Sequence, residues 1–259
     1  KLFGSLSNKI IIVYNHGGNS IWPVKKCYKH SSPKNMASMT GDKINGKTIL
    51  VYFFCLGDLF GDDSAIERPE GWTWSMWKPP YKGKTKTQKK IEANLALVEK
   101  FVVQGVPRKQ IFITGWSVGG RVALVLASIH MDKVGGVISF NHAFMTKFSK
   151  EVKKKGYVKA YNDLKKKFPN VVWMAEKDIN QIKQSEHLPI LVFTHPLDIW
   201  DGLVSDWLEE IPGVKRIIIS DDYTINGRNC KKGGHRIYKY HRIVEAACFQ
   251  EYNSIIKEY

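Results

Sequence analysis

The sequence predicts a single α/β domain whose mostly parallel sheet of about six strands carries helices on both faces. Two observations support this fold class. The chain has 259 residues, of which 43% are hydrophobic and 25% charged, so it can bury a full core. Short apolar runs also alternate with amphipathic segments, which is typical of parallel strands covered by helices. We therefore expect one domain over residues 1–259.

Six short apolar, β-branched runs are expected as the strands of this sheet. They are KIIIVY (9–14), TILVYFF (48–54), QIFIT (110–114), GGVISF (135–140), PILVF (189–193) and RIIIS (216–220). Because these runs are nearly continuous rather than alternating, each strand is expected to be buried on both faces.

Helices are expected between these strands. One apolar stripe at helical spacing predicts a helix that stops at Gly105 and Pro107. The stripe consists of Ile91, Leu95, Val98 and Val102. The region from about 142 to 188 is too long for one connection, so we expect a helical excursion there, forming a small cap before the strand at 189–193.

The charge balance is strongly basic, with 40 Lys and Arg against 24 Asp and Glu and a net charge of +16. Such a charge makes nucleic acid, an anionic membrane and an acidic substrate candidate partners. The lysines are scattered or lie in short helical runs such as KEVKKKG and DLKKKF, which are typical of a solvated face. We expect no specific nucleic-acid binding and, without an apolar run of 18 residues, no transmembrane segment.

The four cysteines form no CxxC pair, so no structural zinc site is expected. Cys230 and Cys248 are close enough in sequence for a disulfide, with two free thiols as the alternative. The chain begins with Lys1, so we expect that an initiator, a signal peptide or a tag has been removed. A secreted or periplasmic location is slightly favoured over a cytoplasmic one.

One serine stands in a glycine-rich turn between an apolar β-branched segment and a second apolar segment, in IFITGWSVGGRVALVLAS (111–128). Small residues two before and two after Ser117 allow a sharp strand-to-helix turn that exposes the hydroxyl at the edge of the sheet. The helix N-terminus that follows favours a negative oxygen. Ser117 is therefore the candidate nucleophile.

Three further segments complete a hydrolytic site. The first strand runs into NHGGNS, where Gly17 and Gly18 can offer a backbone N–H that forms an oxyanion hole together with that of Val118. Asp198 follows the strand at 189–193, and His235 lies in a glycine-containing loop after the last strand. The chain order is thus serine, acid, histidine, each after a strand's carboxyl end.

In the order and spacing of these motifs, the chain from residue 9 onward resembles the α/β-hydrolase superfamily. QGVPRKQIFITGWSVGGRVAL resembles the dienelactone-hydrolase and phospholipase/carboxylesterase-like branch, and GWSVGG is also similar to prolyl-oligopeptidase-type peptidases. About eight residues precede the first strand, so the antiparallel strands that usually open this fold are expected to be missing or trimmed.

The resemblance implies a serine esterase that needs no metal or cofactor. In this hypothesis His235 takes the proton of Ser117, Asp198 orients the imidazolium, and water hydrolyses the acyl-enzyme. Asp201 is the alternative acid, with Asp221 and Asp222 less favoured. His241 is a weak rival for the base. His16 is expected to shape the oxyanion loop, which carries Gly17 and Gly18, and to border the substrate. His195 is expected to pack inside the loop that carries Asp198.

The substrate is expected to be a small ester, with an aromatic or anionic group as the open options. Trp72, Trp74 and Trp77 lie in EGWTWSMWKPPYKG after the second strand, and Trp116 adjoins the nucleophile. These rings either line a substrate pocket or anchor a long loop to the core.

Two other functions compete with the esterase. A serine peptidase of the prolyl-oligopeptidase type would use the same triad but normally carries an additional domain that filters peptides. A non-catalytic binding module would usually have lost a triad residue, and all three candidates are present.

Overall fold

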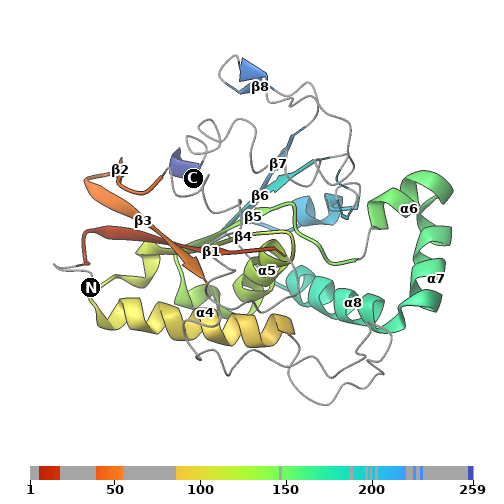
Figure 1. The fold of residues 1–259 in the computed structure, drawn as a ribbon, viewed down its shortest axis with the longest axis horizontal. Coiled ribbons are helices and arrows are strands. Elements are labelled where there is room, and N and C mark those ends of the chain that lie inside the picture. The colour runs from red at the N-terminus through yellow and green to blue at the C-terminus, as the bar shows by residue number, and fades with distance from the viewer. Residues whose placement is uncertain are drawn as a thin grey trace.

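The computed structural model describes residues 6–17, 39–54, 86–145, 148–186, 189–195, 198, 200–201, 204–219, 224–225, 228–229 and 256–258. Within this part of the chain, a seven-stranded sheet has the order β2-β3-β1-β4-β5-β6-β7 (Figure 1). Its strands are β1 Lys9–Asn15, β2 Lys43–Ile44, β3 Lys47–Phe54, β4 Ile111–Trp116, β5 Gly136–Phe140, β6 Ile190–Thr194 and β7 Val214–Ile218.

The six expected strands are all present and run parallel to one another. The strand predicted at 216–220 begins two residues earlier, at Val214. The seventh strand was not predicted. It is the two-residue β2, which pairs antiparallel with the start of β3 across a turn where Asn45 and Gly46 both have positive φ. A separate two-residue pair, β8 Thr224–Ile225 and β9 Arg228–Asn229, was also not predicted.

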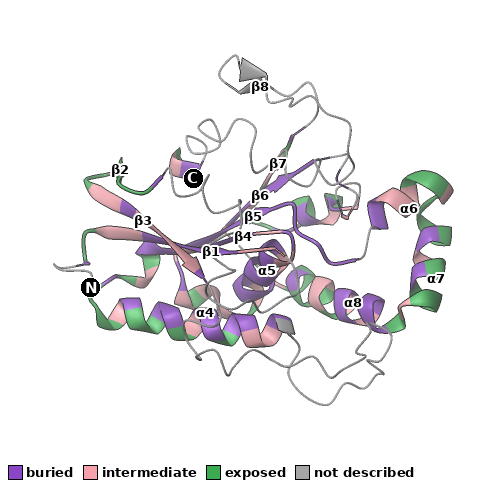
Figure 2. Ribbon diagram, viewed as in Figure 1, coloured by how far each residue is buried: buried purple, intermediate pink, exposed green. Residues whose placement is uncertain are grey.

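Burial separates the central strands from the outer ones (Figure 2). β5 and β6 are buried at every position, as their apolar sequences predicted. β3 and β7 are not: most of their residues are half-buried, and β7 has exposed positions. The expectation of complete burial is wrong for these two strands because β7 forms one edge of the sheet and β3 adjoins only the short β2 at the other.

Three helices cover one face of the sheet: α4 Lys86–Val103, α5 Val118–His130 and α8 Pro169–Lys183 (Figure 1). The predicted stripe of α4 faces inward, with Ile91 and Val98 buried and Leu95 and Val102 packed against the same core. The helix ends at Val103, two residues before Gly105, whose φ is +92°. On the opposite face a second apolar cluster contains Met39 and Ile256, the latter in the short helical segment 256–258.

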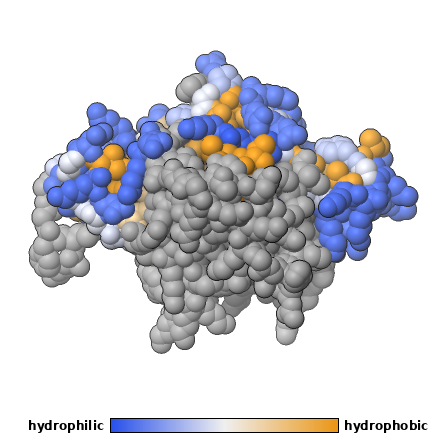
Figure 3. All heavy atoms as spheres, turned by 90° about the horizontal axis from the view of Figure 1, so that it is seen from above, coloured by the Kyte–Doolittle hydropathy of each residue, from blue (hydrophilic) through white to orange (hydrophobic). Residues whose placement is uncertain are grey.

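The region from 142 to 188 is a helical excursion, as predicted, with α6 Phe148–Lys155 and α7 Tyr157–Lys167 preceding α8. α6 and α7 project from the sheet, whereas α8 returns to pack beside α5 (Figure 1). Hydrophilic side chains gather over this projecting end, at the right of Figure 3. The lysine runs that end α6 and α7 are mostly exposed there, as the predicted solvated face requires. The assignment of 142–188 as a cap, and of the chain as one domain, stays a prediction.

Among the residues that the structure describes, no helix is long and apolar enough to cross a membrane.

Candidate active site

Ser117 occupies a sharp turn between β4 and α5, as the glycine pattern predicted. The predicted exposure of the serine is not seen, because the residue is only 7% exposed where β4, β5 and the loop after β1 meet. Its φ and ψ are 59° and −120°, a conformation that residues other than glycine rarely adopt and that is held only when the surroundings fix it. The surroundings do so through the backbone. The N–H of Ser117 donates to the carbonyl of Phe140 at 3.0 Å, and its carbonyl accepts from the N–H groups of Arg121 and Ala143, each at 3.1 Å.

The glycines on either side of Ser117 are required by close backbone contacts. A Cβ atom on Gly115 would collide with the backbone of Gly119, and one on Gly119 would collide with the carbonyl of Asn15 at the end of β1. On Gly120 it would meet Ser139 Oγ at 2.7 Å. The turn can therefore form only with glycine at 115 and 119, which explains physically why the motif predicted it.

The loop after β1 lies against this turn. A Cβ on Gly17 would lie 2.7 Å from Cε3 of Trp116 and 3.0 Å from Cβ of Ser117, so the backbone of Gly17 is next to the serine. Val118 is the first residue of α5. The structure thus brings together two of the three predicted oxyanion-hole residues. Gly18, the third, lies outside the described residues.

Two other predicted residues border this loop. His16 is half-buried, and its Nδ1 lies 2.7 Å from the carbonyl oxygen of Gly17. Trp116 is also half-buried and packs against the apolar cluster on the side of β1 and β5 opposite α5.

A buried amide pair, which sequence analysis missed, ties this loop to α4. The side chains of Asn15 and Asn94 exchange two hydrogen bonds of 3.0 and 2.9 Å. Asn15 also donates to the carbonyl of Thr114, and Asn94 to that of Lys90. Both asparagines are at most 1% exposed, so this paired network fixes the end of β1 just before the oxyanion loop. The only sequence signal was a polar residue at the end of an apolar strand.

Asp198 follows the carboxyl end of β6 and is buried. Its Oδ2 accepts a hydrogen bond of 2.5 Å from Nδ2 of Asn141, and its Oδ1 accepts one of 2.8 Å from the N–H of Trp200. Asn141 comes directly after β5 and has φ of 41°, in the left-handed region that asparagine tolerates. Because the adjacent Phe140 and Ala143 bond to the backbone of Ser117, this loop connects the serine to the acid.

Asp201, the alternative acid, faces a different group of partners. Its Oδ2 accepts from the N–H groups of Phe144 and Met145, the second at 3.3 Å. The carboxyl is 3% exposed, and this burial, with a smaller contribution from the nearby charge of Asp198, raises the pKa of Asp201 to about 7. Asp201 therefore joins the loops after β5 and β6 on the side of α8.

Several predicted residues lie outside the described part of the chain. They are His235, His241, Asp221, Asp222, Gly18, Trp72, Trp74, Trp77 and all four cysteines, including the expected Cys230–Cys248 pair. His195 is described and fully buried, and its carbonyl accepts the N–H of Asp198 at 2.9 Å. In the described residues, no group of three or more His, Cys, Asp or Glu side chains could hold a metal ion.

Comparison with known proteins agrees with this architecture. Residues 73–161 match the model of the phospholipase/carboxylesterase family. Among solved structures, an esterase from Pyrobaculum calidifontis has a TM-score of 0.51 at 18% identity, covering 96% of this chain and 75% of that one. The chain has the α/β-hydrolase fold.

Two further solved structures show how widely the fold is shared. A proline iminopeptidase from Mycobacterium smegmatis has a TM-score of 0.53 at 13% identity and covers 97% of this chain and 89% of its own. A monoacylglycerol lipase from Paleococcus ferrophilus has a TM-score of 0.50 at 14% identity, with 96% and 92% covered. No curated protein sequence matches the chain. The family match over residues 73–161 and the shared fold confirm the resemblance to α/β hydrolases.

Proposed function

We propose that this protein is a serine hydrolase that cleaves carboxylic esters with Ser117 as nucleophile, Asp198 as acid and His235 as base. The observation that carries the proposal is the backbone of Ser117, whose unusual φ and ψ are maintained by three backbone hydrogen bonds and two glycine contacts. A turn that concentrates this much constraint on one serine is typical of a nucleophile in a strand-to-helix turn.

In the proposed reaction, His235 removes the proton from the Ser117 hydroxyl as its oxygen attacks the ester carbonyl. The carbonyl double bond becomes a single bond to a negative oxygen. His235 then donates the proton to the alcohol as the bond to the alcohol oxygen breaks, which leaves an acyl-enzyme. Water, activated by the same histidine, attacks this ester, and release of the carboxylic acid restores Ser117.

Asp198 is suited to the role of the acid because its carboxylate is already oriented. One oxygen is held by the Asn141 amide and the other by the N–H of Trp200, so both oxygens are fixed in place. A carboxylate fixed in this way can orient the histidine and stabilise its cation during the reaction.

The negative oxygen is proposed to be bound by backbone N–H groups. Val118 contributes the N–H at the start of α5, where the helix dipole also favours a negative charge. Gly17, whose backbone adjoins Ser117, or Gly18 contributes the second. Donors that are fixed before the reaction typically contribute about 3 to 4 kcal/mol each to transition-state stabilisation.

The substrate is proposed to be a small ester, and Trp116 and His16 border the site on the side of Gly17. A role for Trp72, Trp74 and Trp77 in substrate selection stays a prediction from the sequence. The proline iminopeptidase among the structural neighbours keeps a peptidase as the second candidate function.

The test combines covalent labelling with a substrate panel. A fluorophosphonate probe should label the wild-type protein at Ser117, as located by peptide mass spectrometry, and Ser117→Ala should lose both labelling and hydrolysis of p-nitrophenyl esters. Ser128→Ala on the same helix is the matched control and should keep both. Esters should be turned over and prolyl p-nitroanilides should not. Labelling elsewhere, or turnover by Ser117→Ala, would refute the assignment.

A further inference from the structure

Residues 141–145, the β5 loop, contact both the proposed nucleophile and the proposed acid. The side chain of Asn141 donates a hydrogen bond to Asp198. The backbone N–H of Ala143 donates to the carbonyl of Ser117. The position of the β5 loop therefore affects how the acid lies relative to the serine.

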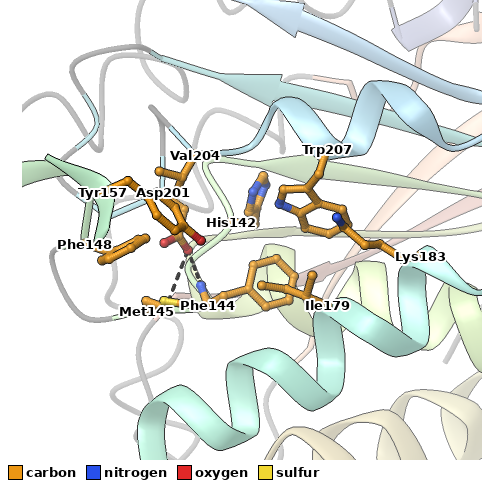
Figure 4. Close-up of a pocket in the computed structure, with 10 residues that line it drawn as sticks. All are labelled: His142, Phe144, Met145, Phe148, Tyr157, Ile179, Lys183, Asp201, Val204 and Trp207. Atoms are coloured by element: carbon orange, nitrogen blue, oxygen red, sulfur yellow. Dashed lines mark hydrogen bonds between the residues drawn. The ribbon is translucent and has the colours of Figure 1, made fainter. Parts of the chain in front are cut away.

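A cavity borders the β5 loop and limits how much packing supports it. The cavity has a volume of about 110 Å³ and lies between this loop, helices α6 to α8 and the segment that follows β6 (Figure 4). His142, Phe144 and Met145 of the loop line it. Of the described residues, neither Ser117 nor Asp198 does, so the cavity is separate from the proposed nucleophile and acid. Side chains that line a cavity have no protein atoms packed against them on that side, so the loop depends more on its polar contacts.

Two charged side chains provide such contacts, and both bind the backbone of Phe144. Its N–H donates to Oδ2 of Asp201 (Figure 4), and its carbonyl accepts a hydrogen bond of 3.2 Å from Nη1 of Arg121. The Arg121 guanidinium also lies 5.5 Å from the centre of the Phe144 ring. Hydrogen bonds to charged groups are stronger than those between neutral groups, so these contacts hold the far end of the β5 loop.

Arg121 is connected to the serine turn through its backbone and to α8 through its side chain. Its N–H donates to the carbonyl of Ser117 at 3.1 Å. On α8, Oδ2 of Asp178 lies 2.7 Å from Nε and 2.6 Å from Nη2 of Arg121, and the carbonyl of Met174 accepts from Nη2 at 3.2 Å. The side chains of Arg121 and Asp178 are only 11% and 16% exposed, so water screens this ion pair little. The pair therefore orients the guanidinium toward the β5 loop.

We propose that Arg121, oriented by Asp178, is a positioning residue for the ester hydrolysis. It holds the β5 loop in place relative to Ser117. Because Asn141 of that loop bonds to Asp198, the proposed acid is held at the same time. This inference rests on the proposed function, since it concerns the same serine and acid. If the ion pair only joined α5 to α8, its removal would change stability without changing turnover.

The first arm of the test separates positioning from stability. In the double variant Arg121→Met/Asp178→Leu, apolar side chains replace the ion pair, a change that often leaves stability unchanged or raises it. The hydrogen bond to the Phe144 carbonyl is lost. We expect kcat for p-nitrophenyl esters to fall at least about tenfold, with KM within about twofold of wild type and a similar melting temperature. Wild-type kcat in the folded double variant would overturn the proposal, and so would a loss through KM alone, which would assign Arg121 to substrate binding.

The second arm uses a conservative variant, which decides the question if the double variant does not fold. Arg121→Lys keeps the charge beside Asp178, but one ammonium group lacks the planar fork that reaches the carboxylate and the Phe144 carbonyl together. Its kcat should fall by about threefold or more with KM nearly unchanged. Unchanged kcat in Arg121→Lys would also refute the positioning role.

A matched control replaces a second arginine–carboxylate pair in the same way. Arg108 and Glu99 lie 2.7 Å apart, and neither contacts the β5 loop. Arg108→Met/Glu99→Leu should keep wild-type kcat, and an equal loss there would show that the effect is not specific to Arg121. The wild-type protein separates the two hypotheses: if it neither hydrolyses esters nor reacts with a fluorophosphonate at Ser117, the proposed function fails, whereas an active wild type with equally active variants refutes only the role of Arg121.

Discussion

Around Ser117 the backbone sets the geometry, whereas around Asp198 side chains do. The serine turn is fixed by backbone hydrogen bonds and by glycines too close to neighbouring backbone to carry a side chain. The acid-side loops are joined by polar side chains: Asn141 to Asp198, Asp201 to the backbone of Phe144 and Met145, and His142 to Ser205 at 2.9 Å.

This difference predicts how the region around Ser117 and the region around Asp198 should respond to substitution. Backbone atoms in close contact cannot move apart easily. A single methyl group added to a glycine beside Ser117 should therefore destabilise the whole fold. A side-chain hydrogen bond can be removed one at a time. Substitutions around Asp198 should therefore lower activity by different amounts while the protein stays folded. Four predictions test this contrast.

The largest expected effect is on turnover, from Asp198→Asn. An amide favours the wrong imidazole tautomer and cannot stabilise its cation, so kcat should fall by about 10³ to 10⁴ while the melting temperature changes little. Asp201→Asn, which makes the same change three residues away, should reduce kcat far less. Steady-state kinetics on p-nitrophenyl esters measure both, and a larger loss in Asp201→Asn would transfer the role of acid to Asp201.

The next effect is on stability, from Gly119→Ala. Helix propensity alone would make alanine in α5 more stable by about 0.5 to 1 kcal/mol. The collision with the carbonyl of Asn15 should instead cost ~3 kcal/mol and abolish turnover. Gly156→Ala is the control: its φ of +80° is also unfavourable to alanine, but its Cβ would meet nothing within 4 Å. Urea unfolding should show a clearly greater loss for Gly119→Ala, and a stabilised variant would contradict the backbone argument.

A smaller effect is the pH dependence of stability set by Asp201. Its pKa is raised in the folded state, so the protonated carboxyl favours folding below the unfolded pKa of about 4, and this contribution is lost as pH rises toward the folded pKa of about 7. The corresponding free energy is at most ~4 kcal/mol, and the backbone hydrogen bonds that the carboxylate accepts offset part of it. Asp201→Asn should therefore be more stable than wild type by ~2 kcal/mol at about pH 8 and nearly equal to it at about pH 4. Thermal unfolding at both pH values measures the difference in stability between Asp201→Asn and wild type. A difference that is the same at both pH values would show that the Asp201 carboxyl does not set the pH dependence.

The smallest effect is expected from Asn141→Gly. Glycine accepts the left-handed φ of this position, so the backbone is kept while the hydrogen bond to Asp198 is lost. We expect kcat to fall by about tenfold, which corresponds to ~1.4 kcal/mol, with KM nearly unchanged. Asn45→Gly, at another asparagine with positive φ, is the control and should leave kcat alone. A loss of kcat as large as that of Asp198→Asn would contradict the expectation that substitutions around Asp198 have graded effects.

The features that sequence analysis predicted are those that depend on neighbours along the chain. The turn at Ser117, the contact of Gly17 with that turn, the six parallel strands and the inward stripe of α4 each follow from local residue order and the shared direction of parallel strands. Local patterns could not predict β2 or the exposure of β7, because whether an apolar strand lies at an edge is decided by which other segments pair with it.

The sequence by itself determined the α/β fold, the position of the constrained serine and the strand ends from which the proposed hydrolytic site is built. Only the tertiary structure decided what holds that site. Asn15 meets Asn94 across 79 residues of chain, and Asn141 meets Asp198 across 57. An asparagine carries no local signal of its distant partner, since hydrogen bonds between side chains form only where packing brings the two elements together and excludes water. For the same reason, the sequence around Asp198 and Asp201, which are three positions apart, gave no sign that Asp198 faces the loop leading to Ser117 while Asp201 lines a separate cavity.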